Sequence, residues 1–157
     1  MFSVKIAPFF LVLLFFHFSG RENCCNNNIK IKLLNTDCFQ LEQANDLLFE
    51  VENTSDNDFY TKKSFFLYNL NLLDNNGNTV KPFRLINEDG DKELILLKKQ
   101  QKTKISIPYN FSDRFLLNNG DRYTLLLEYY NTQKKSNANK LLTGKYTIPS
   151  LIFSGCQ

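Results

Sequence analysis

The chain has 157 residues, a net charge of +3 and a sequence pI near 8.6. This length is enough for one domain of ordinary size. The charge is mild, and the lysines over residues 98–104 are interrupted by Gln and Thr, so the sequence predicts no nucleic-acid partner. A strand edge protected by lysines is the better interpretation of that stretch.

Residues 1–20 predict a secretory signal peptide. Lys5 precedes an apolar run over residues 6–16, and Ser19 and Gly20 follow shortly after it. The run is shorter than the roughly 20 apolar residues that a helix needs to cross a bilayer. We therefore expect cleavage near Ser19 or Gly20 and a protein that is secreted, periplasmic or held in the cell envelope.

After the signal peptide we expect a short flexible segment over residues 21–28 and one domain over residues 29–157. Four cysteines lie in this mature part, and an even count in an oxidising compartment favours disulfides. A bridge between neighbours would be a strained vicinal bond, so we expect the last cysteine to pair with one of the first three. The alternative is a lipoprotein that is acylated at Cys24. Three polar residues, 21–23, separate this cysteine from the predicted leader. The disulfide candidates are Cys24, Cys25, Cys38 and Cys156.

Short stretches of alternating apolar and polar residues recur along the rest of the chain, separated by Asn, Asp and Gly. This pattern predicts the strands of an all-β sandwich or barrel. We expect a hairpin loop over residues 74–78, where Asn and Gly tolerate positive φ. The expected strands cover residues 29–33, 47–52, 66–72, 79–85, 93–97, 103–107, 123–129 and 144–153.

The spacing of Leu117, Gly120 and Tyr123 is the most informative pattern in the chain. It is typical of the tyrosine corner of Greek-key sandwiches, in which the hydroxyl reaches back to a main-chain group upstream. Glycine allows the corner to turn. The spacing predicts a structural role for these three residues and a long strand after them.

Several segments carry a resemblance to a known family. They are residues 51–55, 73–77, the polar strand 102–108, and residues 120–123 with 144–147. With them, residues 47–153 resemble the small immunoglobulin-like domains of secreted bacterial proteins, and the layout is similar to the BsuPI-type proteinase inhibitor family. The resemblance implies an immunoglobulin-like Greek-key β-sandwich of about seven to nine antiparallel strands. It also makes proteinase inhibition by a presented loop one of the expected functions.

The residues needed for common catalytic sites are missing. The one histidine, His17, lies in the predicted signal peptide, so the mature chain lacks the usual general base and zinc ligand. No thioredoxin-like or nucleotide-binding motif occurs. Paired carboxylates remain, but Asp56, Asp58 and the acidic stretch 87–91 are more typical of turns. We predict no enzymatic activity, no metal and no cofactor; a carboxylate hydrolase is the alternative.

Two loops, over residues 54–63 and 131–142, should lie at one end of an immunoglobulin-like sandwich. They combine aromatic and basic side chains, which suit a protein or glycan partner. The alternative is that Phe59 packs beneath its own loop and the lysines keep this end soluble. The candidate partner-binding residues are Phe59, Tyr60, Lys62, Lys63, Lys134 and Lys135.

The sequence as a whole predicts an exported, non-catalytic protein-interaction or ligand-binding module of the bacterial envelope or secretome. Two alternatives stay open: a proteinase inhibitor that presents a sandwich loop, and a lipid-anchored structural subunit of the envelope. Contact with a membrane is expected only through the signal peptide or a lipid on Cys24.

Overall fold

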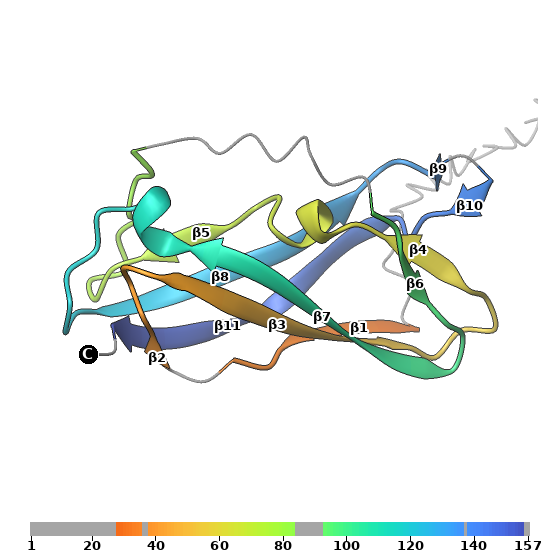
Figure 1. Ribbon diagram of the computed structural model, residues 1–157, viewed down its shortest axis with the longest axis horizontal. Helices are drawn as coiled ribbons and strands as arrows, with labels where there is room; N and C mark the ends of the chain where they lie inside the picture. The colour runs from red at the N-terminus through yellow and green to blue at the C-terminus, as the bar shows by residue number, and fades with distance from the viewer. Residues whose placement is uncertain (1–27, 36–37, 84–92, 137, 156–157) are drawn as a thin grey trace, which may run out of the picture.

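The structure is a computed structural model that describes residues 28–35, 38–83, 93–136 and 138–155 (Figure 1). The predicted signal peptide and nearly all of the predicted flexible segment lie outside the described residues, as does the acidic stretch 87–91. The same is true of Cys24, Cys25 and Cys156.

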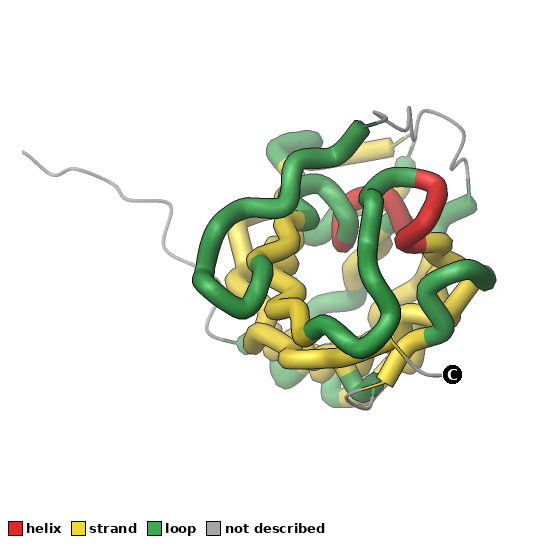
Figure 2. Tube along the Cα trace, turned by 90° about the vertical axis from the view of Figure 1, so that its left-hand side faces the viewer, coloured by secondary structure: helices red, strands yellow, loops and turns green. Residues whose placement is uncertain are grey.

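The described residues form an all-β sandwich, which is the predicted fold class. One layer, the β3 sheet, has the order β1-β3-β7 and consists of β1 (Ile29–Leu33), β3 (Ala44–Asn53) and β7 (Gln101–Asn110). The other layer, the β8 sheet, has the order β2-β11-β8-β5. Its strands are β2 (Cys38–Phe39), β11 (Gly144–Gly155), β8 (Arg122–Asn131) and β5 (Asn71–Leu73). An end-on view shows loops that cross this end in front of the strands (Figure 2).

Two short ribbons lie at one end of the sandwich, which we call the β4 end (Figure 1). In one, β4 (Phe59–Thr61) pairs with β6 (Ile95–Leu97); in the other, β9 (Lys135–Ser136) pairs with β10 (Asn139–Lys140). Two 3₁₀ helices complete the elements, η1 (Lys63–Phe66) and η2 (Phe111–Asp113). No described helix is long and apolar enough to span a membrane.

The strand inventory differs in detail from the predicted seven to nine antiparallel strands. The described part of the chain has eleven strands, three of them only two residues long. One pairing, β2 with β11, is parallel. Strands this short carry too little alternation to be recognised in a sequence. The immunoglobulin-like order of the strands stays a prediction.

The core lies between the two sheets and is rich in Phe and Tyr. The long strands alternate buried and outward residues, as half-buried antiparallel strands do. At the end opposite to β4, the ring of Phe39 packs on those of Phe111 and Phe153, with centroids 5.2 and 4.9 Å away. Nearer the β4 end, the ring of Phe66 packs on Tyr129 at 5.0 Å. These edge-on and tilted contacts are the favoured geometries of aromatic pairs.

The predicted strand over residues 66–72 is wrong for most of its length. Its first residue, Phe66, is the last of the 3₁₀ helix η1, and only Asn71–Leu73 form a strand. The physical reason is that the neighbours Phe65 and Phe66 both pack against Tyr129, at 6.0 and 5.0 Å between ring centroids. A strand sends neighbouring side chains to opposite faces and could not bring both rings to Tyr129. Tyr68 consequently points to solvent and is 62 % exposed.

The predicted return strand over residues 79–85 is reduced to a single bridge between Thr79 and Leu73 in its described part. The loop before it forms as predicted. The main-chain N–H of Asp74 donates to the Asn78 carbonyl oxygen at 2.9 Å, and Gly77 has a φ of 79°. The Asp74 carboxylate accepts from the N–H groups of Asn76 and Asn78, which closes the turn locally.

Candidate functional site

The residues of the predicted tyrosine corner lie together at the start of β8. The main-chain N–H of Asn118 donates to the hydroxyl oxygen of buried Tyr123 over 2.9 Å. Gly120 has a φ of 91°, a conformation that favours glycine. Leu117 is half-buried and packs against the core. These contacts are structural, and they fix the chain as it enters the long strand.

The two loops that were expected to share one end do lie side by side at the β4 end. Tyr60 and Leu141 form a parallel bridge, and the N–H of Leu142 donates to the Tyr60 carbonyl oxygen at 2.8 Å. A buried network ties them from below: the Tyr129 hydroxyl accepts from Thr61 Oγ1 at 3.1 Å and donates to the Leu142 carbonyl oxygen at 2.9 Å. Burial raises the pKa of Tyr129 well above its usual value, so this hydroxyl stays neutral.

The aromatic rings at the β4 end are already covered by the chain's own lysines. Phe59 is only 7 % exposed, and the Lys140 ammonium lies 4.9 Å from its ring centroid. The Lys62 ammonium lies 5.9 Å from the centroid of Phe65. Phe59 therefore packs beneath its own loop, which is the alternative to partner binding that the loop composition left open. Of the other candidates, Tyr60, Lys62 and Lys63 are half-buried, while Lys134 and Lys135 are exposed.

The outer face of the β3 sheet is a ladder of opposite charges. Glu52 on β3 lies between Lys30 on β1 and Lys102 on β7, and Glu50 is flanked by lysines in the same way. The ammonium nitrogens of Lys30 and Lys102 lie 3.9 and 3.3 Å from the carboxylates of Glu52 and Glu50. Long, hydrated Lys and Glu side chains are depleted at protein interfaces, so this face is poor material for binding.

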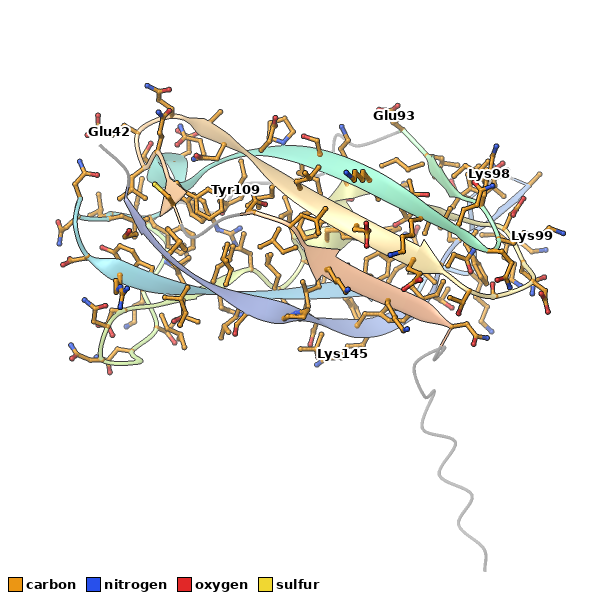
Figure 3. The ribbon with its side chains drawn as sticks, turned by 90° about the horizontal axis from the view of Figure 1, so that it is seen from below. Glu42, Glu93, Lys98, Lys99, Tyr109 and Lys145 are labelled. Carbon is orange, nitrogen blue, oxygen red and sulfur yellow. The ribbon has the colours of Figure 1, made fainter. Side chains whose placement is uncertain are left out.

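The outer face of the β8 sheet has a different character. The ring of exposed Tyr68 lies against that of Tyr130 on β8, with centroids 4.9 Å apart and planes inclined by 37°. Tyr130 is opposite Lys145 of β11, whose side chain lies on the outside of the sandwich (Figure 3). Ile152, farther along β11, is 57 % exposed. This face therefore offers aromatic and apolar surface to solvent.

A groove of about 480 Å³ lies on this face. Its lining includes Asn69, the sequence neighbour of Tyr68, and Lys145, which is opposite Tyr130. Glu128 is the acidic residue among those lining it, and its carboxylate accepts hydrogen bonds from Asn69 Nδ2 and from Lys145 Nζ, the latter at 2.8 Å. Burial alone would raise the pKa of Glu128, but these two hydrogen bonds and the Lys145 charge outweigh it, so its pKa lies below the usual range. The groove is lined by Asn69, Asn71, Leu126, Leu127, Glu128, Lys145, Thr147 and Ile148.

Two smaller hollows lie at the end opposite to β4, on either side of Leu116, which is 81 % exposed. Their polar groups already serve the local turns: Asn118 Nδ2 donates to Asp121 Oδ2 at 3.1 Å, and Asp74 closes the hairpin loop. They are weaker candidates than the β8-sheet groove. In the described residues, no three metal-ligating side chains of the types His, Cys, Asp and Glu gather in one place.

Sequence reasoning missed this groove because its residues meet only through strand pairing. Asn71 is opposite Leu126, and Thr147 is opposite Glu128, across three strands that are distant in sequence. The signal that was available is the doublet Tyr129-Tyr130 on an alternating strand, which must send one ring inward and one outward.

Cys38 is the one predicted disulfide candidate within the described residues. It lies on β2 opposite Ser154 of β11.

Comparison with known proteins found no match: no protein-family model, no curated protein and no solved structure matches the chain. The resemblance of residues 47–153 to secreted immunoglobulin-like domains and to BsuPI-type inhibitors therefore stays a prediction.

Proposed function

We propose that this protein is an exported, non-catalytic binding module that holds its partner on the outer face of the β8 sheet. The observation that carries the proposal is the exposed Tyr68 ring, backed by Tyr130 and placed beside the Glu128 groove. Tyrosine supplies large contact area at low conformational-entropy cost, which is why it is enriched in binding surfaces. The charged outer face of the β3 sheet supports the choice by contrast.

The chemistry of the groove supports a binding role over a catalytic one. Glycoside hydrolysis needs two carboxyl groups across the bond to be cleaved, whereas Glu128 is the single acid among the lining residues. Its lowered pKa keeps it ionised, so it is a poor proton donor near neutral pH. A fixed, ionised carboxylate is suited to accepting hydrogen bonds from a ligand.

Export is part of the proposal and rests on the leader-like residues 1–20.

We also propose a disulfide between Cys38 and Cys156. Cys38 is opposite Ser154, two residues before Cys156 in sequence. Cys24 and Cys25 precede Ile29 in sequence, and Ile29 pairs with Asn53 at the far end of β3. The chain then runs along β1 before it reaches Cys38 on β2, so Cys38 is the better partner for Cys156. In an oxidising compartment such a bond would tie the C-terminus to β2.

Retention by cell fractions tests the binding face. The exported protein, purified from its own cells, is mixed with their washed envelope fraction and their secreted fraction, and retention is measured by sedimentation or capture. We expect Tyr68→Ala to reduce retention strongly and Lys104→Ala, on the outer face of the β3 sheet, to leave it unchanged. Full retention of Tyr68→Ala would overturn the proposal, and so would failure of both fractions to retain the unaltered protein.

A second function, proteinase inhibition, is favoured by one observation at the tip of the β6–β7 turn. Lys98 and Lys99 are exposed there (Figure 3), and the turn is held firmly. The Lys99 N–H donates to Asp58 Oδ1 at 2.7 Å, and Gln100, with a φ of 55°, donates from Nε2 to the Thr54 carbonyl oxygen at 2.7 Å. A rigid basic tip would suit a proteinase with an acidic specificity pocket.

A panel of secreted proteinases tests this second function. Inhibition at stoichiometric dose that disappears in Lys98→Ala or Lys99→Ala would support it. A panel that includes trypsin-like enzymes and shows no inhibition would remove it. A lipid-anchored envelope subunit is decided separately by mass spectrometry of the mature N-terminus, since a diacylglyceryl group on Cys24 would establish it.

A further inference from the structure

We infer that the ligand of the β8-sheet groove is a neutral saccharide. One sugar ring would lie on the exposed face of Tyr68, and its hydroxyl groups would hydrogen-bond to the groove beside it. The inference rests on the proposed binding face and adds the chemical class of the partner. Four properties of the groove carry it: its charge, its hydrogen-bonding groups, its apolar floor and the fixed tyrosine pair.

Charge is the first property. The residues that line the groove include one anion, Glu128, and one cation, Lys145, and the two form an ion pair 2.8 Å long. The pair has no net charge. A charged ligand would have to compete with an ion pair whose partners both have pKa values shifted in favour of the charged forms. The groove therefore favours a ligand without net charge.

Hydrogen-bonding groups are the second property. Asn71 and Thr147 are exposed at the groove and can each both donate and accept. The Glu128 carboxylate can accept about four hydrogen bonds, and the structure assigns it those from Asn69 and Lys145. Sugar hydroxyls likewise donate and accept, so donor–acceptor groups spaced along two strands match them better than they match an extended apolar ligand.

The apolar floor and the tyrosine pair are the remaining properties. Leu126 lies between these polar groups, opposite Asn71. The C–H faces of a sugar ring are apolar, although its edges are polar, and they pack well on aliphatic and aromatic surface. One face of Tyr68 is held by Tyr130 at 4.9 Å between centroids, yet the residue is 62 % exposed. The contact with Tyr130 restrains the ring before a ligand arrives, which lowers the entropic cost of binding.

Binding of defined oligosaccharides tests the inference directly. Cellohexaose, maltohexaose, mannohexaose and chitohexaose (as the N-acetylated form) serve as neutral probes, and hexagalacturonate serves as the anionic one. We expect the mature protein to bind at least one neutral probe in calorimetry or affinity electrophoresis, and to bind hexagalacturonate more weakly. Tyr68→Ala should weaken the neutral complex about tenfold, which corresponds to about 1.4 kcal/mol of lost stacking.

Two control variants separate lost binding from lost folding. Tyr68→Phe keeps the ring and should bind within about twofold of the unaltered protein. Lys104→Ala, on the opposite outer face, should bind equally well. The inference is overturned if no neutral probe binds, if hexagalacturonate alone binds, or if Tyr68→Ala binds the neutral probe as tightly as the unaltered protein does.

Chemical treatment of the cell fraction that retains the protein distinguishes this inference from the proposed function on which it rests. Periodate cleaves vicinal diols of sugars, whereas proteinase removes protein. Retention that is sensitive to Tyr68→Ala, is lost after periodate and survives proteinase supports a saccharide. Retention that is sensitive to Tyr68→Ala but is lost only after proteinase means a protein partner. In that case the binding face stands and the saccharide inference fails.

Discussion

The hydroxyl of Tyr129 donates to the carbonyl oxygen of Leu142, 2.9 Å away, and thereby joins β8 to the chain between β10 and β11. Thr61 Oγ1 donates to the same hydroxyl, so three segments meet at one buried oxygen. Since Tyr129 is fully buried, none of these groups can turn to water when the hydroxyl is removed. This hydroxyl therefore adds a buried link to the main-chain contacts between the two loops at the β4 end.

Tyr129→Phe should lower the free energy of unfolding by about 1–3 kcal/mol, because buried Thr61 Oγ1 loses its acceptor. The Leu142 carbonyl oxygen also loses one of its two donors and keeps Asn131 Nδ2. Urea denaturation measures the loss. Tyr130→Phe is the matched control. The Tyr130 ring lies next in sequence but on the outer face, so its substitution should change the free energy of unfolding by no more than about 0.5 kcal/mol. Equal effects of the two substitutions would contradict a special role for the buried hydroxyl.

Tyr123→Phe should cost less, about 1 kcal/mol. It removes the acceptor of the Asn118 N–H, but Asn118 is exposed and its N–H can turn to water instead. Thermal and urea denaturation of the variant measure the difference. An unchanged melting temperature would mean that the hydrogen bond at the start of β8 contributes nothing to stability.

Gly120 tests the backbone at the same corner. Its φ is 91°, and a Cβ there would meet no atom within 4 Å, so any cost of substitution comes from the backbone alone. Gly120→Val should lose about 1–3 kcal/mol, because β-branched residues strongly disfavour positive φ. Gly120→Asn should lose less, since Asn tolerates this region better. Asn and Val variants of equal stability would show that the turn relaxes to another conformation.

The long half-buried strands were predictable from the sequence, and the groove was not. β1, β3, β8 and β11 have one face in the core, so the alternation of apolar and polar residues marks each of them. The start of β5 was misplaced because η1 before it packs two neighbouring rings against Tyr129.

The groove depends on which strands pair. It joins the turn before β5 to β8 and β11, and no local pattern states that Asn69 and Lys145 share one carboxylate. Pattern reasoning also left open whether Phe59 contacts a partner or packs beneath its own loop. In the structure Phe59 belongs to the core, and the Lys140 ammonium lies over its ring. The position of a ring relative to solvent is decided by tertiary packing, which composition does not reveal.

The ion pair of the groove should make stability depend on pH. The net effect of its surroundings holds the pKa of Glu128 below its usual value of 4.5, so the folded state binds the proton less readily than the unfolded state. The stabilisation is therefore full above that usual value and is lost as the pH falls through the lower, folded-state pKa. Lys145 behaves in the opposite way: hydrogen bonding to Glu128 raises its pKa, so its contribution is lost only above pH 10.5.

Glu128→Gln measures this dependence. The variant should be less stable than the unaltered protein at pH 7, and the difference should shrink as the pH is lowered below 4. Denaturation curves at a series of pH values from 7 to about 2 give the comparison. A difference between the two proteins that stays constant across this range would show that Glu128 stabilises the fold through shape alone and not through charge.

The proposed Cys38–Cys156 bond predicts a stability that depends on redox conditions. The bond would close a loop on the order of a hundred residues, and a loop of that size limits the unfolded chain strongly. Reduction should therefore lower the free energy of unfolding by about 2–5 kcal/mol. Reductant should have a much smaller effect on Cys38→Ser, which cannot form the bond, and mass spectrometry of unreduced peptides should find residues 38 and 156 linked. A peptide that links Cys156 to Cys24 or Cys25 would contradict the pairing, because it would require the N-terminal segment to reach the end of the sandwich at which β2 meets β11.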